Sequence, residues 1–189
     1  MPRYIEELRS GQRRKVRIWS AASSTGQEAY STAICIRNYL EERSITDIRP
    51  EQFEILATDI SKTVLEIARR GRYDAISIAR GLDSKYKERY FRKEGMVWVL
   101  EDAIKNAVRF EHFNLQNSFV FLGKFDIIFC RYVLIYFADT LKQELGKKFY
   151  DSIESDGIMF LGASELHHCL EPYFERVHYA NGTYYVRRR

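Results

Sequence analysis

Short apolar runs alternate with amphipathic stretches in the first part of the chain. The run "KVRIWSA" (15–21) predicts a strand that leads into small residues, and the segment after Gly26 predicts a helix. The apolar face of that helix recurs at helical spacing: Ala29, Ala33, Ile36 and Leu40. The run "FEILATDI" (53–60) predicts a second strand, and Ser61 and Gly71 mark the start and end of a second helix. This order is typical of a parallel sheet with crossover helices.

The pattern changes between residues 72 and 124. The segment "RGLDSKYKERYFRKEG" (80–95) is polar and helix-like, whereas "MVWVL" (96–100) and "VRFEHFNL" (108–115) are strand-like. The seven residues between the two strand-like runs favour an antiparallel pair. We therefore expect a small inserted subdomain over 72–124, made of a helix and an antiparallel β-pair.

Four further segments complete the pattern. They predict a buried strand, a helix with an aligned apolar face, a further strand and a hairpin: "KFDIIFCR" (124–131), "LKQELGKKFYDSI" (141–153), "DGIMFLGAS" (156–164) and "FERVHYANGTYYVRRR" (174–189). The Asn181–Gly182 pair is a strong turn signal for that hairpin. A mostly parallel sheet with a C-terminal antiparallel hairpin is the common core of S-adenosylmethionine-dependent methyltransferases. We therefore expect an α/β, Rossmann-like class I methyltransferase fold, with residues 1–189 as a single domain.

Composition narrows the class of protein. With 46% hydrophobic and 30% charged residues among 189, the chain is typical of a globular protein rather than a disordered one. It has neither an apolar run long enough for a membrane span nor the apolar core of a signal peptide, so we expect the cytosol. The three cysteines are spaced like neither a zinc site nor a disulfide framework. The net charge is +4, and the basic clusters at 13–15 and 187–189 favour solvated termini over an anionic partner surface.

The candidate chemistry lies where the predicted parallel strands end, because ligands bind beyond the carboxyl ends of such strands. The loop "SAASSTG" (20–26) offers small side chains, and Asp59 follows the second strand. A carboxylate there can accept hydrogen bonds from both ribose hydroxyls of an adenosine ligand. The alternative interpretation of Asp59 is an acid that stabilises the helix N-terminus near Ser61. A single glycine, Gly26, in place of G-x-G-x-x-G argues against a dinucleotide.

Five motifs in order resemble the chemotaxis receptor methyltransferases of the CheR type. They are "RIWSAASSTGQEAYSTAI", "ILATDIS", "FNL", "FDIIFCRYVLIYF" and "GASE", and the resemblance runs from about Arg17 to Tyr185. It implies transfer of a methyl group from S-adenosylmethionine to the γ-carboxylate of a glutamate on a chemoreceptor. The products would be a glutamyl methyl ester and S-adenosylhomocysteine. The implied partner is the cytoplasmic domain of the receptor, without nucleic acid and without insertion into the membrane.

The resemblance also implies roles for single residues. Asp59 would bind the ribose, Asn114 and Leu115 would line the adenine pocket, and Tyr136 would be a catalytic residue near the transferred methyl. The remaining cofactor contacts would be Ala21, Glu28, Arg131 and Tyr132. No metal is expected, since the adjacent His167 and His168 are typical of a surface loop. From its own pattern Tyr136 is typical of a core aromatic, and Cys130 of a packing residue.

The chain departs from the family pattern at four places. It has "GQEAY" where the family usually has "GEEPY", and Tyr132 where the family has the asparagine of "CRN". The segment between Phe91 and Met96 is shorter than in members that dock a receptor C-terminal peptide, so we expect recognition without that peptide. The family's N-terminal helical domain and its "T-x-F-F-R" segment would precede the first residue. Either a fragment or a reduced family member fits this pattern.

Three alternatives to the methyltransferase interpretation stay open. One is a regulatory module that binds S-adenosylmethionine or S-adenosylhomocysteine with little or no transfer. Another is a methyltransferase for RNA or a small molecule on the same fold. The last is a nicotinamide-dependent oxidoreductase, which the single-glycine loop disfavours. The sequence does not identify the receptor, its modified glutamates or the oligomeric state.

Overall fold

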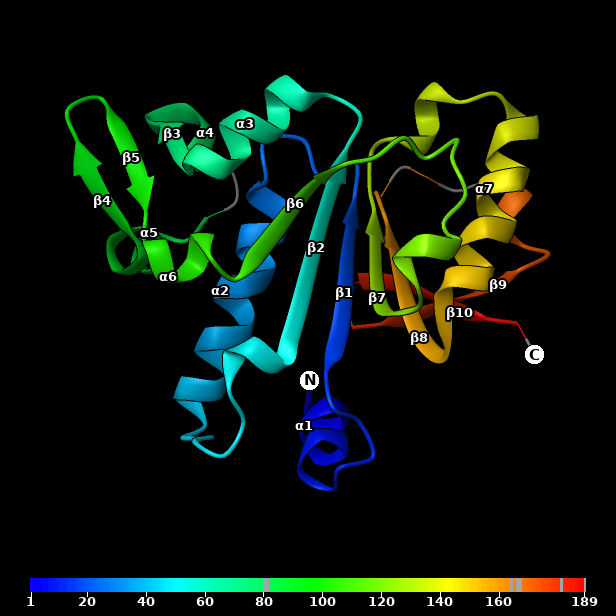
Figure 1. Ribbon diagram of the computed structural model, residues 1–189, viewed down its shortest axis with the longest axis horizontal. Helices are drawn as coiled ribbons and strands as arrows, with labels where there is room; N and C mark the ends of the chain where they lie inside the picture. The colour runs from blue at the N-terminus through cyan, green and yellow to red at the C-terminus, as the bar shows by residue number, and fades with distance from the viewer. Residues whose placement is uncertain (80–81, 164, 166–167, 181, 189) are drawn as a thin grey trace.

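The computed structural model is built around a seven-stranded sheet (Figure 1), and it describes residues 1–79, 82–163, 165, 168–180 and 182–188. The strand order is β6-β2-β1-β7-β8-β10-β9. The bounds of these strands are β1 (Val16–Ala21), β2 (Phe53–Asp59), β6 (Val108–His112), β7 (Phe125–Cys130), β8 (Ile153–Leu161), β9 (Phe174–Tyr179) and β10 (Gly182–Arg187). Strand β10 is antiparallel to both of its neighbours, β8 and β9, whereas the other strand pairs of the sheet are parallel. The expected class I methyltransferase fold with its C-terminal hairpin is confirmed, and Asn181 of the turn lies outside the described residues.

Helices cover both faces of the sheet (Figure 1). Four helices of the chain, with their bounds, are α1 (Pro2–Arg9), α2 (Gln27–Glu42), α3 (Lys62–Arg70) and α7 (Asp139–Ser152). Helices α2 and α3 share one hydrophobic cluster with β1, β2 and β6, whereas α7 shares another with β7 and β8. Among the described residues, no helix has the length and apolar content needed to cross a membrane.

Strand β1 lies at the centre of the sheet and is apolar on both faces. Val16 and Ile18 pack into the cluster on the α2 side, while Trp19 and Ala21 pack into the cluster on the α7 side. The indole Nε1 of Trp19 donates to Thr58 Oγ1 at 2.9 Å, which satisfies its buried polar atom. A strand buried on both faces therefore reads as a nearly continuous apolar run, as "KVRIWSA" does.

The predicted helices form where the sequence indicates. The four residues of the predicted face of α2 are buried, and α3 is bounded as expected by Ser61 and Gly71. The Ser61 hydroxyl accepts from the backbone N–H of Val64, and Gly71 ends α3 with a φ of 58°. Gly146 within α7 has a packing reason, because a Cβ there would lie 2.9 Å from Leu170 Cδ2.

A second sheet of three strands lies beyond α3 (Figure 1). Its order is β3-β5-β4, and its strands are β3 (Arg72–Asp74), β4 (Phe91–Glu94) and β5 (Val97–Leu100). The short helices around it are α4 (Ala75–Ala79), α5 (Ser84–Tyr90) and α6 (Asp102–Lys105). The Tyr73 hydroxyl donates to the carbonyl of Thr25 at 2.8 Å, so this sheet contacts the loop that follows β1.

The predicted antiparallel pairing of 96–100 with 108–115 is wrong. Strand β5 pairs with β3 and β4, whereas β6 joins the main sheet parallel to β2. The predicted polar helix over 80–95 is too long as well, since α5 ends at Tyr90 and β4 begins at Phe91. The segment with Phe91 and Lys93 pairs with β5 across the turn at Gly95 and so forms a hairpin. The polar character of the segment does not indicate this hairpin.

Helix α1 lies at the amino ends of the strands and is tied there by Asp126 of β7. The Asp126 carboxylate accepts from the backbone N–H of Arg17 at 2.6 Å and pairs with Arg13. The Tyr4 hydroxyl donates to the Asp126 carbonyl at 3.2 Å. Arg13, which the sequence assigns to a solvated basic cluster, is therefore a half-buried structural residue.

The described residues also form the 3-10 turns η1 (Pro50–Gln52), η2 (Val120–Leu122), η3 (Leu134–Tyr136) and η4 (His168–Leu170), of which η4 packs against α7.

Candidate functional site

The candidate site lies at the carboxyl ends of β1 and β7. From β1 the chain continues outward through β2 to β6, whereas from β7 it continues in the other direction to β8. This reversal of direction marks the place between the loops that follow β1 and β7 where open parallel sheets bind ligands, and we call this place the crevice. The predicted site residues come from the ends of β1, β2, β6 and β7 and from the start of α2.

The loop after β1 is tightly folded around Ser23. Ala22 and Ser24 have φ values of 59° and 50°, and the Ser23 N–H donates to the carbonyl of Thr58 at 2.8 Å. Ser23 is buried, and its Oγ has no hydrogen-bond partner within the described part of the chain. Because this oxygen is inaccessible from outside, Ser23 contributes to the folding of the loop rather than to an open ligand surface.

Asp59 is held by two backbone N–H groups. Its Oδ2 accepts from Ser24 at 2.9 Å, and its Oδ1 accepts from Ser61 at 2.9 Å. Each carboxylate oxygen can accept more than one hydrogen bond, so both retain capacity for a ligand. The contact with Ser61, which precedes α3, also fits the alternative role near the N-terminus of that helix, and the two roles are compatible.

Glu28 joins three parts of the site. It lies in the first turn of α2, where its Oε1 accepts from the Ser20 hydroxyl of β1 at 2.7 Å. Its Oε2 pairs with Arg131 Nη1 from the loop after β7 at 3.1 Å. The pair thus links the start of α2 to the loop after β7, and the Arg131 side chain stays 40% exposed.

Asn114 and Leu115 follow β6 and lie next to the end of β2. The Phe113 N–H donates to the carbonyl of Asp59 at 3.0 Å, which continues the parallel pairing of the two strands. Asn114 Oδ1 accepts from the N–H of Gln116 at 2.9 Å and fixes the turn, while Leu115 packs into the α7-side core. Asn114 is half-buried and Leu115 is buried.

The loop after β7 carries the remaining predicted residues. Tyr132 has a φ of 58° and is 49% exposed, and Arg131 stacks on its ring at 5.1 Å. Tyr136 ends η3 and is 79% exposed, so its interpretation as a core aromatic is wrong. Ala21 is buried with its side chain in the core, which leaves only its backbone for a ligand.

Cys130 packs into the core as predicted. Burial raises the pKa of its thiol well above the ordinary value, and the nearby carboxylates of Glu165 and Glu28 add to the rise. A neutral, buried thiol is neither a nucleophile nor a metal ligand. Glu165, which precedes the two histidines, is buried, and His167 lies outside the described residues.

Two residues at this edge escape the sequence argument. Ser23 is one of several small residues in its loop, and nothing in the pattern marks it as the buried one. Glu165 belongs to the quoted motif "GASE", which is the signal that could have identified it.

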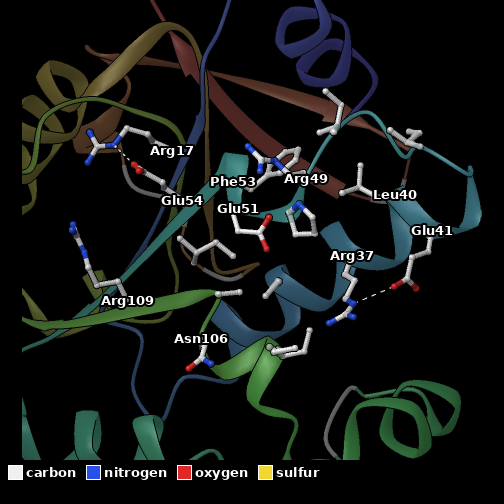
Figure 2. Close-up of a pocket in the computed structure, with 18 of the residues that line it drawn as sticks. Arg17, Arg37, Leu40, Glu41, Arg49, Glu51, Phe53, Glu54, Asn106 and Arg109 are labelled. Carbon is white, nitrogen blue, oxygen red and sulfur yellow. Dashed lines mark hydrogen bonds and ion pairs between the residues drawn. The ribbon is translucent and has the colours of Figure 1, made fainter.

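A cavity of about 1100 Å³ lies at the opposite end of the molecule (Figure 2). It is bounded by α2, α6 and the start of β2, and Arg37, Glu51 and Asn106 are among its polar lining residues. None of the eight predicted site residues lines it. Because this cavity lies near the amino end of β2, it is separate from the crevice described above.

The fold and the site together define a class I methyltransferase domain. The sheet has the reversed strand β10 between β8 and β9, and the crevice offers a carboxylate at the end of β2 without a glycine-rich phosphate loop. Such a crevice suits an adenosine ligand that lacks a pyrophosphate.

The chain belongs to the family described as "CheR methyltransferase, SAM binding domain", whose model matches residues 1–182. The family description confirms S-adenosylmethionine as the cofactor. The small-residue loop and the Asp59 carboxylate are compatible with this ligand.

Several curated proteins are similar over most of the chain. "Chemotaxis protein methyltransferase Cher2" of Pseudomonas putida is 39% identical over 181 residues, which are 95% of this chain and 65% of that protein. "Chemotaxis protein methyltransferase" of Vibrio parahaemolyticus is 40% identical over 174 residues, 92% of this chain and 62% of that protein. The chain thus spans less than two thirds of the length of these relatives.

A solved structure supports the fold alone. The TehB-like SAM-dependent methyltransferase from Corynebacterium glutamicum superposes with a TM-score of 0.53 at 12% identity, covering 97% of this chain and 86% of that one.

Proposed function

We propose that this chain is the cofactor-binding domain of a chemotaxis protein methyltransferase that esterifies glutamate side chains of chemoreceptors in the cytoplasm. The observation that carries the proposal is the Asp59 carboxylate, which two backbone N–H groups hold at the end of β2. The family and the named relatives supply the reaction class and the chemotaxis setting.

Different residues of the chain would bind different parts of the cofactor. Asp59 would accept from the ribose hydroxyls, and Asn114 and Leu115 would line the adenine site next to the end of β2. Glu28, paired with Arg131, would face the part of the ligand near α2, with the backbone of Ala21 and the ring of Tyr132 at its sides. Bound S-adenosylmethionine supplies an electrophilic methyl group on a sulfonium.

The protein's contribution to transfer would be alignment. A glutamate carboxylate is ionised at neutral pH, so it needs no general base. Tyr136 is exposed in the segment after β7, and its hydroxyl would donate to one carboxylate oxygen and leave the other free to attack. Orientation alone can supply a large part of the rate when both reactants are held in line.

The proposed partner is the cytoplasmic domain of a chemoreceptor, bound without a C-terminal receptor peptide. Support comes from the short connection between β4 and β5, where Gly95 and Met96 form the whole turn. Residues 72–124 would form the inserted subdomain of a single domain over 1–189. Its three-stranded sheet covers 72–100, whereas β6, which lies in the same range, belongs to the main sheet.

Calorimetric titration with S-adenosylhomocysteine tests the cofactor site. We expect the wild-type chain to bind and Asp59→Ala to bind at least about tenfold more weakly, since a charged hydrogen-bonding partner is lost. Asp151→Ala is the matched control, because Asp151 pairs with Lys147 on the exposed surface of α7. Equal affinity of Asp59→Ala and the wild type, or a folded wild type that does not bind, would contradict the proposal.

Transfer is tested with methyl-labelled S-adenosylmethionine and receptor cytoplasmic domains, with and without their C-terminal peptide. Label that mild alkali releases as methanol indicates a carboxylate ester, and equal labelling of both receptor forms supports peptide-independent recognition. Binding of S-adenosylhomocysteine without any labelling would favour the alternative function, a regulatory binding module. The exposed Tyr132 ring at the crevice is the observation that favours this alternative.

A further inference from the structure

Glu165 is a buried carboxylate that accepts hydrogen bonds from backbone N–H groups of two loops. It is 1% exposed. Its Oε2 accepts from Tyr132 at 2.5 Å and from Gly162 at 2.8 Å, and its Oε1 accepts from Leu134 at 3.0 Å. Tyr132 and Leu134 belong to the loop after β7, while Gly162 follows β8. A single side chain therefore joins the loops at the ends of two adjacent strands.

The residue that Glu165 holds most closely is in an unfavourable backbone conformation. Tyr132 has a φ of 58°, a region that side chains other than glycine, asparagine and aspartate seldom adopt. Gly162 contacts both residues. A Cβ at this position would lie 2.7 Å from Glu165 Oε2 and 2.8 Å from the Tyr132 ring, so only glycine fits. Gly162 thus leaves room for the carboxylate and the ring to meet.

The loop held in this way carries two residues of the candidate site. Arg131 precedes Tyr132 and pairs with Glu28 across the crevice, and Tyr136 follows Leu134 at the end of η3. The Glu165 contacts fall on the residues between them. The directions in which Arg131 and Tyr136 leave the loop therefore depend on the backbone that Glu165 fixes.

We propose that Glu165 is a positioning residue for the cofactor crevice, one that holds residues 131–136 in their binding conformation by accepting the N–H groups of Tyr132 and Leu134. The inference rests on the proposed function, since it assigns Glu165 a role in binding S-adenosylmethionine. Glu165 itself touches neither cofactor nor substrate; it acts through Arg131, Tyr132 and Tyr136.

Replacement of Glu165 has graded consequences. Glu165→Gln keeps one acceptor oxygen, which can serve Tyr132 and Gly162, but turns its NH₂ group toward the N–H of Leu134. Glu165→Ala removes the acceptor of all three bonds and leaves buried N–H groups without partners. We expect the affinity for S-adenosylhomocysteine to fall about threefold to tenfold in Glu165→Gln and further in Glu165→Ala, at a temperature where each variant is folded.

Asp126→Asn is the matched control. Asp126 is also a buried carboxylate of the same sheet that accepts a backbone N–H, but it lies at the amino end of β7. We expect this variant to lose stability and to keep the wild-type affinity. Equal loss of affinity in Asp126→Asn and Glu165→Gln would reduce the role of Glu165 to general stability and overturn the proposal.

Hydrogen exchange of the free protein supplies a readout that needs no cofactor. The amides of Tyr132, Leu134 and Gly162 should exchange at least about tenfold faster in Glu165→Gln than in the wild type, while amides of β2 keep their rates. Unchanged exchange would show that Glu165 does not hold the loop. Faster exchange with unchanged affinity would show that the loop is held but does not position the site, which also overturns the inference.

A second substitution tests the link with the backbone of Tyr132. Asparagine adopts positive φ more readily than tyrosine, so the loop of Tyr132→Asn depends less on Glu165. The effect of Glu165→Gln on affinity should therefore shrink severalfold in the Tyr132→Asn background. A folded wild type that fails to bind S-adenosylhomocysteine would refute the proposed function and the positioning role with it, whereas the exchange data would still decide whether Glu165 holds the loop.

Discussion

Tyr132 shows how one residue can combine an unfavourable backbone with an exposed ring. Its φ of 58° costs about 1–2 kcal/mol for a residue with a branched or bulky side chain. Half of its surface is exposed, so the ring recovers little of that cost by burial. Asparagine, which the family resemblance associates with this position, tolerates the same conformation through its short polar side chain.

We expect Tyr132→Asn to stabilise the free protein by up to about 1 kcal/mol, which corresponds to a rise in Tm of about 2–4 °C for a chain of this size. Thermal unfolding followed by circular dichroism measures this. Tyr179→Asn is the control, because Tyr179 is exposed in β9, where the backbone is extended, and should give no stabilisation. A lower Tm for Tyr132→Asn would mean that the contacts of the ring outweigh the backbone strain.

At the scale of elements, the junction between β1 and α2 packs the loop after β1 against neighbouring elements. Gly26 precedes α2 with a φ of 88°, and a Cβ there would lie 2.9 Å from Phe110 Cζ and 3.0 Å from Ala68 Cβ. The start of α2 is thus packed against α3 and β6. Gly26 serves this packing, and the room for a ligand comes from the neighbouring small residues.

Gly26→Ala should destabilise the protein by about 2–4 kcal/mol, because backbone strain and overpacking add. Gly11→Ala measures the backbone strain alone, because Gly11 has a φ of 72° and a Cβ there would meet no atom within 4 Å. We expect this variant to lose about 1–2 kcal/mol of stability. Urea denaturation of the two variants gives the difference. Equal losses would mean that α2 can move away from Phe110 at no cost.

Helices and strands with strong local signals could be predicted from the sequence. Which strands pair with one another could not always be predicted. The cap at Ser61, the αL end at Gly71 and the apolar face of α2 are local features, and the structure confirms them. The sequence also predicts strands over 97–100 and 108–112. Their pattern of apolar and polar residues, however, is the same for an antiparallel hairpin and for strands of two different sheets. Pairing depends on contacts distant in sequence, which a run of four or five residues does not encode.

At the scale of the whole molecule, the two ends of the sheet differ in how they are closed. The amino ends of β1 and β7 are sealed by α1 through Asp126, Arg13 and Tyr4. Burial raises the pKa of the Asp126 carboxyl above its usual value of 3.8, and this outweighs the hydrogen bond from Arg17 and the charge of Arg13. The carboxyl ends remain open as the candidate site.

The raised pKa of Asp126 has a defined sign for stability. Between 3.8 and the higher pKa of the folded state, the folded protein binds more protons at this group than the unfolded chain does, so the free energy of unfolding falls as the pH rises. Asp126→Asn removes this contribution. Urea denaturation from about pH 3 to about pH 6 should therefore show the wild type losing stability relative to Asp126→Asn as the pH increases. A difference that moves in the opposite direction would mean that Arg13 dominates.

The location of the candidate site was predictable because topology brings the carboxyl ends of parallel strands together. Asn114 and Asp59 do lie at the ends of the adjacent strands β6 and β2, and Arg131 lies at the same edge after β7, on the other side of β1. The burial of Glu165 and Ser23 was not predictable. Glu165 meets Tyr132 across 33 positions, and Ser23 and Ser24 are the same residue type, so the sequence does not distinguish the buried one from the exposed one.

The place of β10 in the sheet sets an order in which the molecule can be completed during synthesis. Within the described residues, strand β9 does not pair with β8, and β10 lies between them. Since β10 follows the other strands of the sheet in sequence, β9 leaves the ribosome before the strand it pairs with exists. The five parallel strands, at whose ends the crevice lies, can pair earlier. The cofactor crevice can therefore form before β10 is added at the far edge of the sheet.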